Sequence, residues 1–212
     1  MKQLLCVLMA VVFVACAQAK KVKVNIDGTM LPSETTIYLI INEDKAHAQV
    51  VPVNNHQFSV TVTVDRNAFI RIHDSKEWPE RSAFVLIPDS RHIAINWDTG
   101  DIKGSKLSQK LKAACKEIRD ASPESFHIDV FSENPEDWKR AQEQESAIRE
   151  GMLEEQRTVF KKLMLANKSN YLCAWIAYCF PRLLEGETGL MLEQMKRKPK
   201  WMNHPLLTEK RK

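Results

Sequence analysis

The sequence predicts an α+β protein in which an N-terminal antiparallel β-sandwich is followed by an α-helical module. Up to Gly104, apolar and polar residues alternate in short segments that end in turn residues, which is typical of half-buried strands. After Ser105, apolar residues recur every three or four positions, which is typical of helices. Residues 83–105 join the two patterns, since Gly100 and Gly104 bracket one last short strand before the first helix.

The change of pattern favours two domains over one. The chain has 212 residues, of which 44% are hydrophobic and 27% charged, and this length suits one domain of about 150 residues or two smaller ones. We predict a signal peptide at residues 1–19, the β-sandwich at 20–104, the helical module at 105–200 and a basic tail at 201–212. We interpret the tail as a solvated end. Because no aromatic residues interleave with its basic ones, we expect no nucleic-acid partner.

The first 19 residues have the features of a signal peptide. Lys2 supplies the positive start, residues 4–15 form an apolar run too short to span a bilayer comfortably, and Ala17-Gln18-Ala19 has the small-x-small form of a cleavage site. Cleavage between Ala19 and Lys20 would release an exported protein. We therefore expect the periplasm or the cell envelope as its location, a setting that permits disulfides.

A second processing site leads to an alternative location. Residues 13–16, Phe-Val-Ala-Cys, look like a lipoprotein box, although Phe13 stands where Leu or Val is usual. If this site is used, Cys16 carries lipid and the protein is an outer-membrane lipoprotein. The chain has a membrane partner only in that case.

The front part of the chain predicts seven or eight short strands. Expected strands are 22–26, which Asp27-Gly28 ends, then 35–41, 46–53, 58–64, 68–73, 83–87, 92–97 and the segment between Gly100 and Gly104. Asn54-Asn55-His56 predicts a tight connection. No helical crossover separates the strands, so we expect an antiparallel sandwich or a flattened barrel rather than a parallel sheet.

The back part predicts four helices. Ser105 is placed to cap the first, and Asn134-Pro135 is a strong start signal for a long, highly charged helix that ends near Asn167. Its heptad pattern is not sustained, so its charged surface indicates a solvated face more than a coiled coil. Ser169 can cap an apolar helix at 170–180, which forms the core of the module or a docking face for an absent partner domain. A last helix is expected at 188–198.

The order and spacing of several segments resemble the family called domain of unknown function 4369. These segments are Asp27-Gly28, Ile37-Tyr38-Leu39, Gln57-Phe58-Ser59 and residues 84–88, 93–95 and 102–105. The resemblance covers about residues 22–115, and no single motif in it is specific. It departs at Asp89-Ser90, where the family often has glycine. The resemblance implies a β-sandwich that precedes a helical linker and a thioredoxin-like domain in exported thiol-disulfide oxidoreductases of Bacteroidota-type envelopes. This chain stops at Lys212 without such a domain.

Three cysteines follow the expected cleavage site, and none forms Cys-x-x-Cys. No residue therefore inherits the catalytic role of the resembling enzymes. Cys173 and Cys179 are six residues apart on one predicted helix, which is too far around and along the helix for a bond between them. A disulfide between Cys115 and one of these two stays open, and buried free thiols are the other interpretation.

The sequence predicts no catalytic residue, cofactor or metal site. The six histidines lack metal-type spacing, and neither a phosphate-binding glycine loop nor a Gly-x-Ser-x-Gly motif occurs. Trp78, in a charged loop, could stack on a glycan or a peptide. Trp97 falls in phase with Ile93 and Ile95, which favours a place in the core.

These observations lead to two hypotheses about function. The first is an exported, non-catalytic binding or interaction protein of the cell envelope. The second is the non-catalytic front part, or a partner subunit, of a thioredoxin-like thiol-disulfide oxidoreductase whose catalytic domain is lost or supplied by a separate chain. The missing Cys-x-x-Cys favours the first, and the apolar helix at 170–180 keeps the second open.

Overall fold

The computed structural model describes residues 21–30, 35–74, 84–122, 128, 131–194 and 199–208. It contains both sheets and helices, which confirms the α+β class. Two compact units divide at Lys106 and Leu107, two residues from the predicted boundary. The predicted cleavage between Ala19 and Lys20, the lipidation of Cys16 and the stacking by Trp78 lie outside the described residues.

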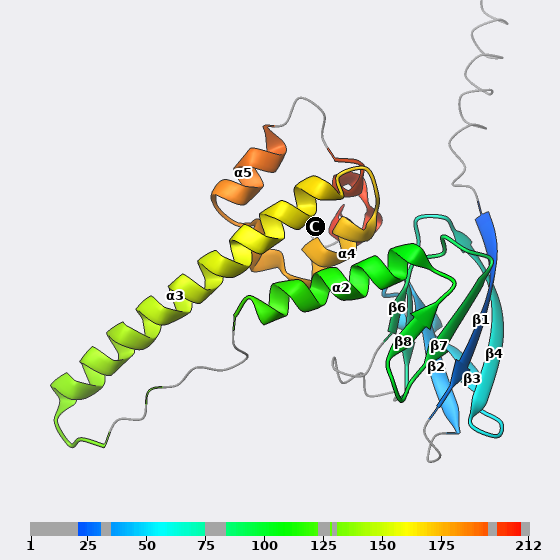
Figure 1. The fold of residues 1–212 in the computed structure, drawn as a ribbon, viewed down its shortest axis with the longest axis horizontal. Helices are drawn as coiled ribbons and strands as arrows, with labels where there is room; N and C mark the ends of the chain where they lie inside the picture. Colours follow the sequence, from blue (N-terminus) through cyan, green and yellow to red (C-terminus); the bar gives the residue numbers. More distant parts are fainter. Residues whose placement is uncertain are drawn as a thin grey trace, which may run out of the picture. The chain divides into compact units, whose positions relative to one another are not determined.

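The first unit consists of two four-stranded sheets that share one core (Figure 1). The strands are β1 (Lys21–Thr29), β2 (Thr36–Ile41), β3 (Gln49–Pro52), β4 (Gln57–Asp65), β5 (Ile70–His73), β6 (Phe84–Leu86), β7 (His92–Asn96) and β8 (Asp101–Lys103). One sheet has the order β4-β1-β7-β8 and the other β3-β2-β5-β6. Both sheets contribute buried Val, Ile and Leu side chains to the core, as in a β-sandwich.

The prediction of a fully antiparallel arrangement is wrong for one strand pair. β1 pairs with β7 in parallel, from Asn25 opposite His92 to Thr29 opposite Asn96, while the other strand pairs are antiparallel. A parallel pair needs a long connection, but not a helical one. Here the connection between β1 and β7 consists of β2 and β3 of the second sheet, β4 of the first, and β5 and β6 of the second.

β1 does not end at Asp27-Gly28, as the sequence predicted, but continues to Thr29. Gly28 faces the core, where a Cβ atom would lie 2.3 Å from the ring of Phe58 and 2.9 Å from Ile95. The glycine therefore makes room for the Phe58 ring rather than terminating the strand.

The predicted strand at 46–53 is shorter in the structure. Asn42 and Glu43 have positive φ angles of 51° and 64°, and the 3-10 helix η1 (Lys45–His47) follows them before β3 begins. Arg71 and Glu43 form an ion pair of 2.8 Å with both side chains nearly buried, which holds this turn against β5. The tight connection after β3 is confirmed, since Asn55 and His56 adopt φ angles of 51° and 61°.

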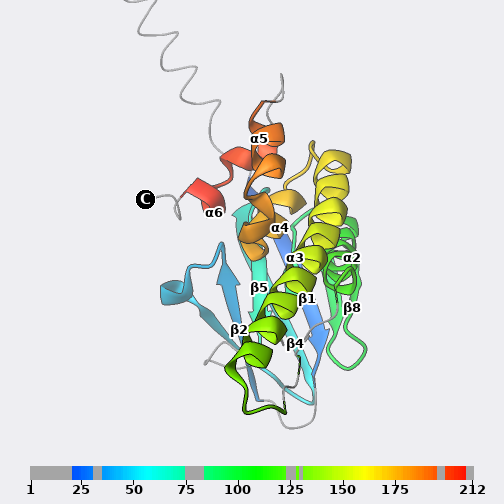
Figure 2. The same cartoon turned by 90° about the vertical axis from the view of Figure 1, so that its left-hand side faces the viewer.

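The second unit is helical. Its helices are α2 (Lys106–Asp120), α3 (Pro135–Ala166), α4 (Leu172–Cys179), α5 (Glu187–Glu193) and α6 (Pro205–Thr208), with 3-10 helices η2 (Pro181–Leu184) and η3 (Lys200–Asn203). The two views in Figures 1 and 2 place α4, α5 and α6 around the C-terminal end of α3. Residues 195–198, where the last predicted helix would have continued, lie outside the described part.

The start of α3 confirms the prediction from Asn134-Pro135. The Asn134 side chain accepts a hydrogen bond of 3.0 Å from the Glu136 amide, and Pro135 occupies the first turn, where no amide donor is needed. Glu136 and Asp137 place negative charge at the positive end of the helix dipole. The helix ends at Ala166 and has Asn167 at its C-cap, as the sequence predicted.

The apolar helix α4 lies in the interior of the helical unit. All six residues Leu172–Ala177 are buried, and α4 contacts η2, η3 and α6. Ser169 does not cap it. The helix begins two residues later than expected, and Asn170 instead accepts a hydrogen bond of 3.2 Å from the Leu172 amide.

Residues 201–208 are folded, so the predicted basic tail is wrong for this stretch. Trp201, His204 and Leu206 are buried, and His204 accepts a hydrogen bond of 3.3 Å at Nδ1 from the Leu206 amide. The Tyr171 ring, just before α4, lies 5.8 Å from the His204 ring. The many basic residues of this region predicted a solvent-exposed tail. They flank an apolar segment, however, and that segment packs on α4.

In the part of the chain that the structure describes, no helix combines the length and the apolar character needed to cross a membrane.

His73 is a buried titratable group in the β unit. It is fully buried at the end of β5, opposite Tyr38 in β2. Burial, together with the charge of Arg71, lowers the pKa of His73 from 6.5 to about 4. The side chain is therefore neutral in the folded protein at neutral pH.

We expect Gly28→Ala to destabilise the protein by about 1–3 kcal/mol, because the new methyl group overlaps the buried Phe58 ring. Gly151→Ala is the matched control. No atom lies within 4 Å of a Cβ at Gly151, and alanine in a helix interior is favoured by about 0.5–1 kcal/mol. Urea unfolding measures both changes. Equal stability of the two variants would contradict the packing role of Gly28.

We expect the free energy of unfolding to fall by roughly 2 kcal/mol between pH 7 and pH 4.5 through His73 alone. In the unfolded chain His73 binds a proton below pH 6.5, whereas in the folded protein it does so only near pH 4. The contribution of His73 to stability is therefore complete above pH 6.5 and is lost as the pH falls from 6.5 toward 4. Urea unfolding at both pH values should show this loss reduced in His73→Gln and unchanged in His47→Gln, which removes an exposed histidine. The same pH dependence in both variants would contradict the assignment.

Candidate functional site

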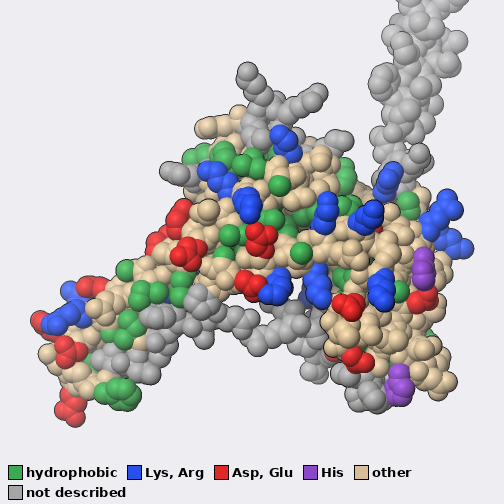
Figure 3. Space-filling model, in the orientation of Figure 1, with side chains coloured by type: hydrophobic (Ala, Val, Ile, Leu, Met, Phe, Trp, Pro, Cys, Tyr) green, Lys and Arg blue, Asp and Glu red, His purple; other side chains and the backbone are tan. Residues whose placement is uncertain are grey.

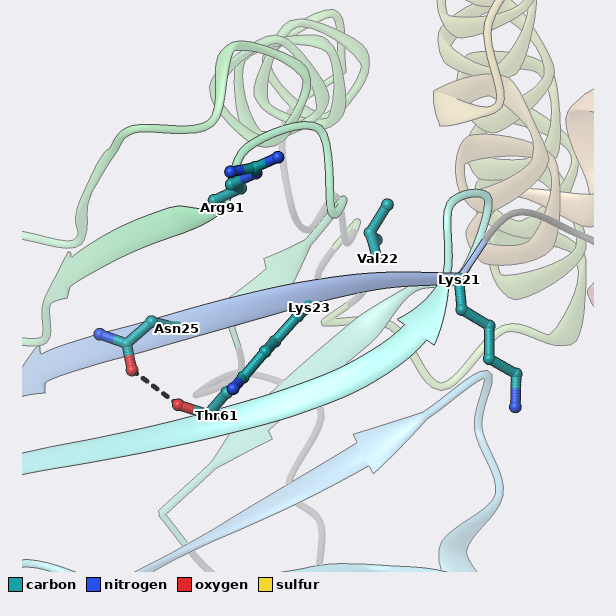
Figure 4. A pocket seen from close by; sticks show the side chains of 6 residues that line it. All are labelled: Lys21, Val22, Lys23, Asn25, Thr61 and Arg91. Carbon is teal, nitrogen blue, oxygen red and sulfur yellow. Dashed lines mark hydrogen bonds between the residues drawn. The ribbon is translucent and has the colours of Figure 1, made fainter.

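The solvent-facing side of the sheet β4-β1-β7-β8 carries a groove of about 560 Å³. Strand alternation produces it, because Val24 and Ile26 of β1 point into the core and Lys21, Lys23 and Asn25 therefore point outward. Six residues line the groove, as Figure 4 shows: Lys21, Val22, Lys23, Asn25, Thr61 and Arg91. Three of the six are cations and none is an acid.

Each cation has a defined place on the sheet. Lys21 and Lys23 are two residues apart in β1, so their Cα atoms lie about 7 Å from each other. Arg91 comes just before β7. The backbone N–H of Asn25 donates a hydrogen bond of 2.8 Å to the backbone carbonyl of Arg91. This bond holds the Arg91 backbone beside β1. Arg91 therefore lies across β1 from Lys23 in Figure 4.

Within the described residues, none of these three cations forms an ion pair. Figure 3 shows Lys and Arg side chains gathered at the end of the β unit where β1 begins. The groove therefore presents positive charge that the described part of the protein does not neutralise. Such a surface attracts anions, and the attraction weakens as salt increases.

A hydrogen-bonded network continues from the groove along β1. Thr61 donates to Asn25 Oδ1 at 3.0 Å, and Asn25 Nδ2 donates to Asp27 at 3.0 Å. His92 Nε2 lies 2.5 Å from the same Asp27 oxygen. These hydrogen bonds therefore fix the side-chain amide of Asn25 in one orientation at the edge of the groove.

Asp27 is ionised and engaged by its neighbours. Hydrogen bonds from Ser59 and then from His92 lower the pKa of Asp27 below its usual value. Ser59 and His92 thus both bind the carboxylate. In a nucleophilic triad the hydroxyl would instead bond to the imidazole, which would take its proton. The geometry of this network supports a charged, hydrogen-bonded surface rather than an activated serine.

In the part of the chain that the structure describes, the sequence-predicted cysteines form no disulfide, and they do not belong to the groove. Cys115 in α2 and Cys173 in α4 are buried, whereas Cys179 at the end of α4 is exposed. Burial raises the pKa of Cys115 to about 11 and that of Cys173 to about 12. Both thiols are therefore protonated and unreactive at neutral pH.

Two further expectations concern tryptophan and metal sites. Trp97 packs on the core with its ring 4.9 Å from that of Phe84, which confirms its place in phase with the core residues. Among residues that the structure describes, no three His, Cys, Asp or Glu side chains lie together in a way that could hold a metal ion.

Sequence reasoning did not single out the groove. The alternation of Lys21, Lys23 and Asn25 was visible and places them on one face of a strand. Arg91 and Thr61 come from distant parts of the chain, and they join the groove only through the pairing of β1 with β7 and β4. No local sequence signal reports that pairing.

We expect Cys179 to react with iodoacetamide at pH 8 at least 100-fold faster than Cys115 and Cys173, because it is exposed while their burial suppresses the thiolate. Peptide mass spectrometry of a labelling time course measures each site. In denaturant all three should react alike. Equal rates in the folded protein would contradict the burial, and a peptide linking Cys115 to Cys173 or Cys179 in unreduced protein would establish the disulfide instead.

No family model, curated protein or solved structure matches this chain.

Proposed function

We propose that this chain is an exported, non-catalytic binding protein of the cell envelope. Its β unit holds an anionic group, phosphate or carboxylate, in the groove between β4, β1 and β7. The observation that carries the proposal is that Lys21, Lys23 and Arg91, which form no ion pairs among the described residues, line the same groove.

The magnitude of the electrostatic attraction indicates the kind of ligand. A contact between unit charges at about 4 Å contributes about 1 kcal/mol in a water-like environment. Three such contacts give about 3 kcal/mol, which corresponds to an affinity in the millimolar range for a ligand that reaches all three cations. Tighter binding requires a ligand with several anionic groups, each of which reaches a different cation of the groove.

Hydrogen bonding supplies orientation in addition to charge. Thr61 and Asn25 line the groove beside Lys23, and the bond between them fixes both side chains. Groups that are held in place before binding lose little entropy when a ligand arrives. Arg91 offers a planar fork that suits phosphate and carboxylate oxygens, whereas the two lysines act as point charges.

The expected export of the chain fits this site. Cleavage between Ala19 and Lys20 would create a new α-amino group one residue before Lys21, the first residue of the groove. That amino group would add positive charge next to the site, because its ordinary pKa is about 8. The resemblance to domain of unknown function 4369, which implies an envelope protein, stays a prediction alongside this proposal.

One observation weighs against the second hypothesis, a docking partner of a thioredoxin-like domain. The apolar helix that would have formed the docking face, α4, is buried among elements of its own unit. Its apolar surface is thus accounted for without a partner domain. We therefore favour the binding protein as the function.

We expect pyrophosphate and citrate to shift the amide signals of β1, Thr61 and Arg91 in NMR titrations of the chain from Lys20 onward, and the affinity to fall as salt is added. Lys23→Glu should weaken binding about tenfold or more, because it replaces an attraction with a repulsion. Lys103→Glu is the matched control, since Lys103 is exposed on the same sheet outside the groove.

Pyrophosphate carries phosphate groups and citrate carries carboxylates. Tighter binding of one of the two ligands would therefore identify the anionic group that the groove recognises. Equal weakening by both substitutions would show a general effect of net charge and would contradict a site in the groove. The absence of any shift at millimolar concentrations of both ligands would also contradict it.

A further inference from the structure

The N-terminal part of α3 lacks the packing that normally stabilises a helix. Of the 32 residues of α3, only Phe160 and Met164 are buried, and both lie in its last two turns. In both Figure 1 and Figure 2 the N-terminal half of α3 runs away from α4, α5 and α6. Isolated helices are marginal in water, and most helical stability in proteins comes from packing of an apolar face.

α3 carries an apolar face that is only partly covered. Trp138 Nε1 donates a hydrogen bond of 2.6 Å to the Ser132 carbonyl, and Ala141, Met152 and Val159 are half-buried. Trp138, Ala141, Ile148, Met152 and Val159 follow one another at spacings of three, seven, four and seven residues, which places them on one side of the helix. Trp138 is 50% exposed and Ile148 is 39% exposed. The stripe is interrupted by polar residues at 145 and 156, so it suits a short helix pair better than a long coiled coil.

The charge distribution along α3 identifies the partner. Residues 135–150 contain five acids and three bases, whereas residues 151–168 contain two acids and four bases. Two copies of α3 side by side in antiparallel orientation would place the acidic half of each against the basic half of the other. A parallel pair would place like charge against like charge. The helix dipoles also favour the antiparallel orientation.

The ion pairs within the helical unit do not prevent the acidic and basic halves of two α3 helices from pairing with each other. Arg149 pairs with Glu145, and Arg157 pairs with Glu150 and Glu154, all within the helix. Lys161 and Lys162 of the basic half are exposed, and Lys162 makes one contact of 3.6 Å with Glu117 of α2. Exposed pairs of this kind contribute little, so they can rearrange when a second chain approaches.

We propose that a second copy of this chain packs on the exposed stripe of α3, so that the two helices form an antiparallel pair about a two-fold axis near the middle of α3. The same stripe is then used by both subunits, as two-fold symmetry requires. The interface belongs to the helical unit, and its existence does not depend on the groove in the β unit.

Sedimentation equilibrium over a concentration series tests this proposal on the chain from Lys20 onward. We expect a monomer–dimer equilibrium, weakened at least tenfold by Ile148→Glu, which buries a charge in the stripe. Leu190→Glu is the matched control, since Leu190 is 57% exposed on α5, away from the stripe, and the variant should dimerise like the unchanged chain. Circular dichroism confirms that both variants are folded. A monomer at all concentrations, or equal weakening by both substitutions, would overturn the proposal.

Disulfide cross-linking in a Cys179→Ser background tests the orientation. Met152→Cys lies close to the expected axis and should form a cross-linked dimer. Ala141→Cys would be about 30 Å from its copy in an antiparallel pair, given the rise of 1.5 Å per residue, and should not cross-link. Cross-linking of Ala141→Cys would show a parallel pair and overturn the antiparallel arrangement.

Discussion

The pairing of β1 with two different strands is the constraint on which the β unit depends. β1 pairs along all nine residues with β4 and along its last five with β7. Successive side chains of a β-strand point to opposite faces of the sheet, and the pairing with β4 holds β1 in this conformation along its whole length. The two faces of β1 can therefore serve different purposes within the same nine residues.

The inward face of β1 builds the core, and the outward face builds the groove. On the inside, Gly28 makes room for the Phe58 ring from β4, which explains why the strand tolerates a glycine near its end. On the outside, Lys23 and Asn25 line the groove together with Arg91 and Thr61, which the two neighbouring strands bring alongside β1. A single register decides both arrangements, because a shift by one residue would exchange the faces.

In the helical unit, apolar surface is distributed unevenly. α4 is surrounded, and the segment around Trp201 packs on it, so the last described residues complete a small core. In α3, by contrast, Phe160 and Met164 are the two fully buried residues. The apolar surface of α4 is buried within the unit, whereas the apolar face of α3 is only partly covered. This difference indicates that α3, and not α4, offers an interaction surface.

The sequence by itself determined the α+β class, most strand positions and the capped start of α3, because strand alternation and the Asn134-Pro135 signal act between residues close in the chain. Only the tertiary structure decided the parallel pairing of β1 with β7, the folded segment after Trp201 and the groove with Arg91. Each of these depends on contacts between residues far apart in sequence. The free energy of such contacts comes from packing and charge in three dimensions, which no local pattern encodes.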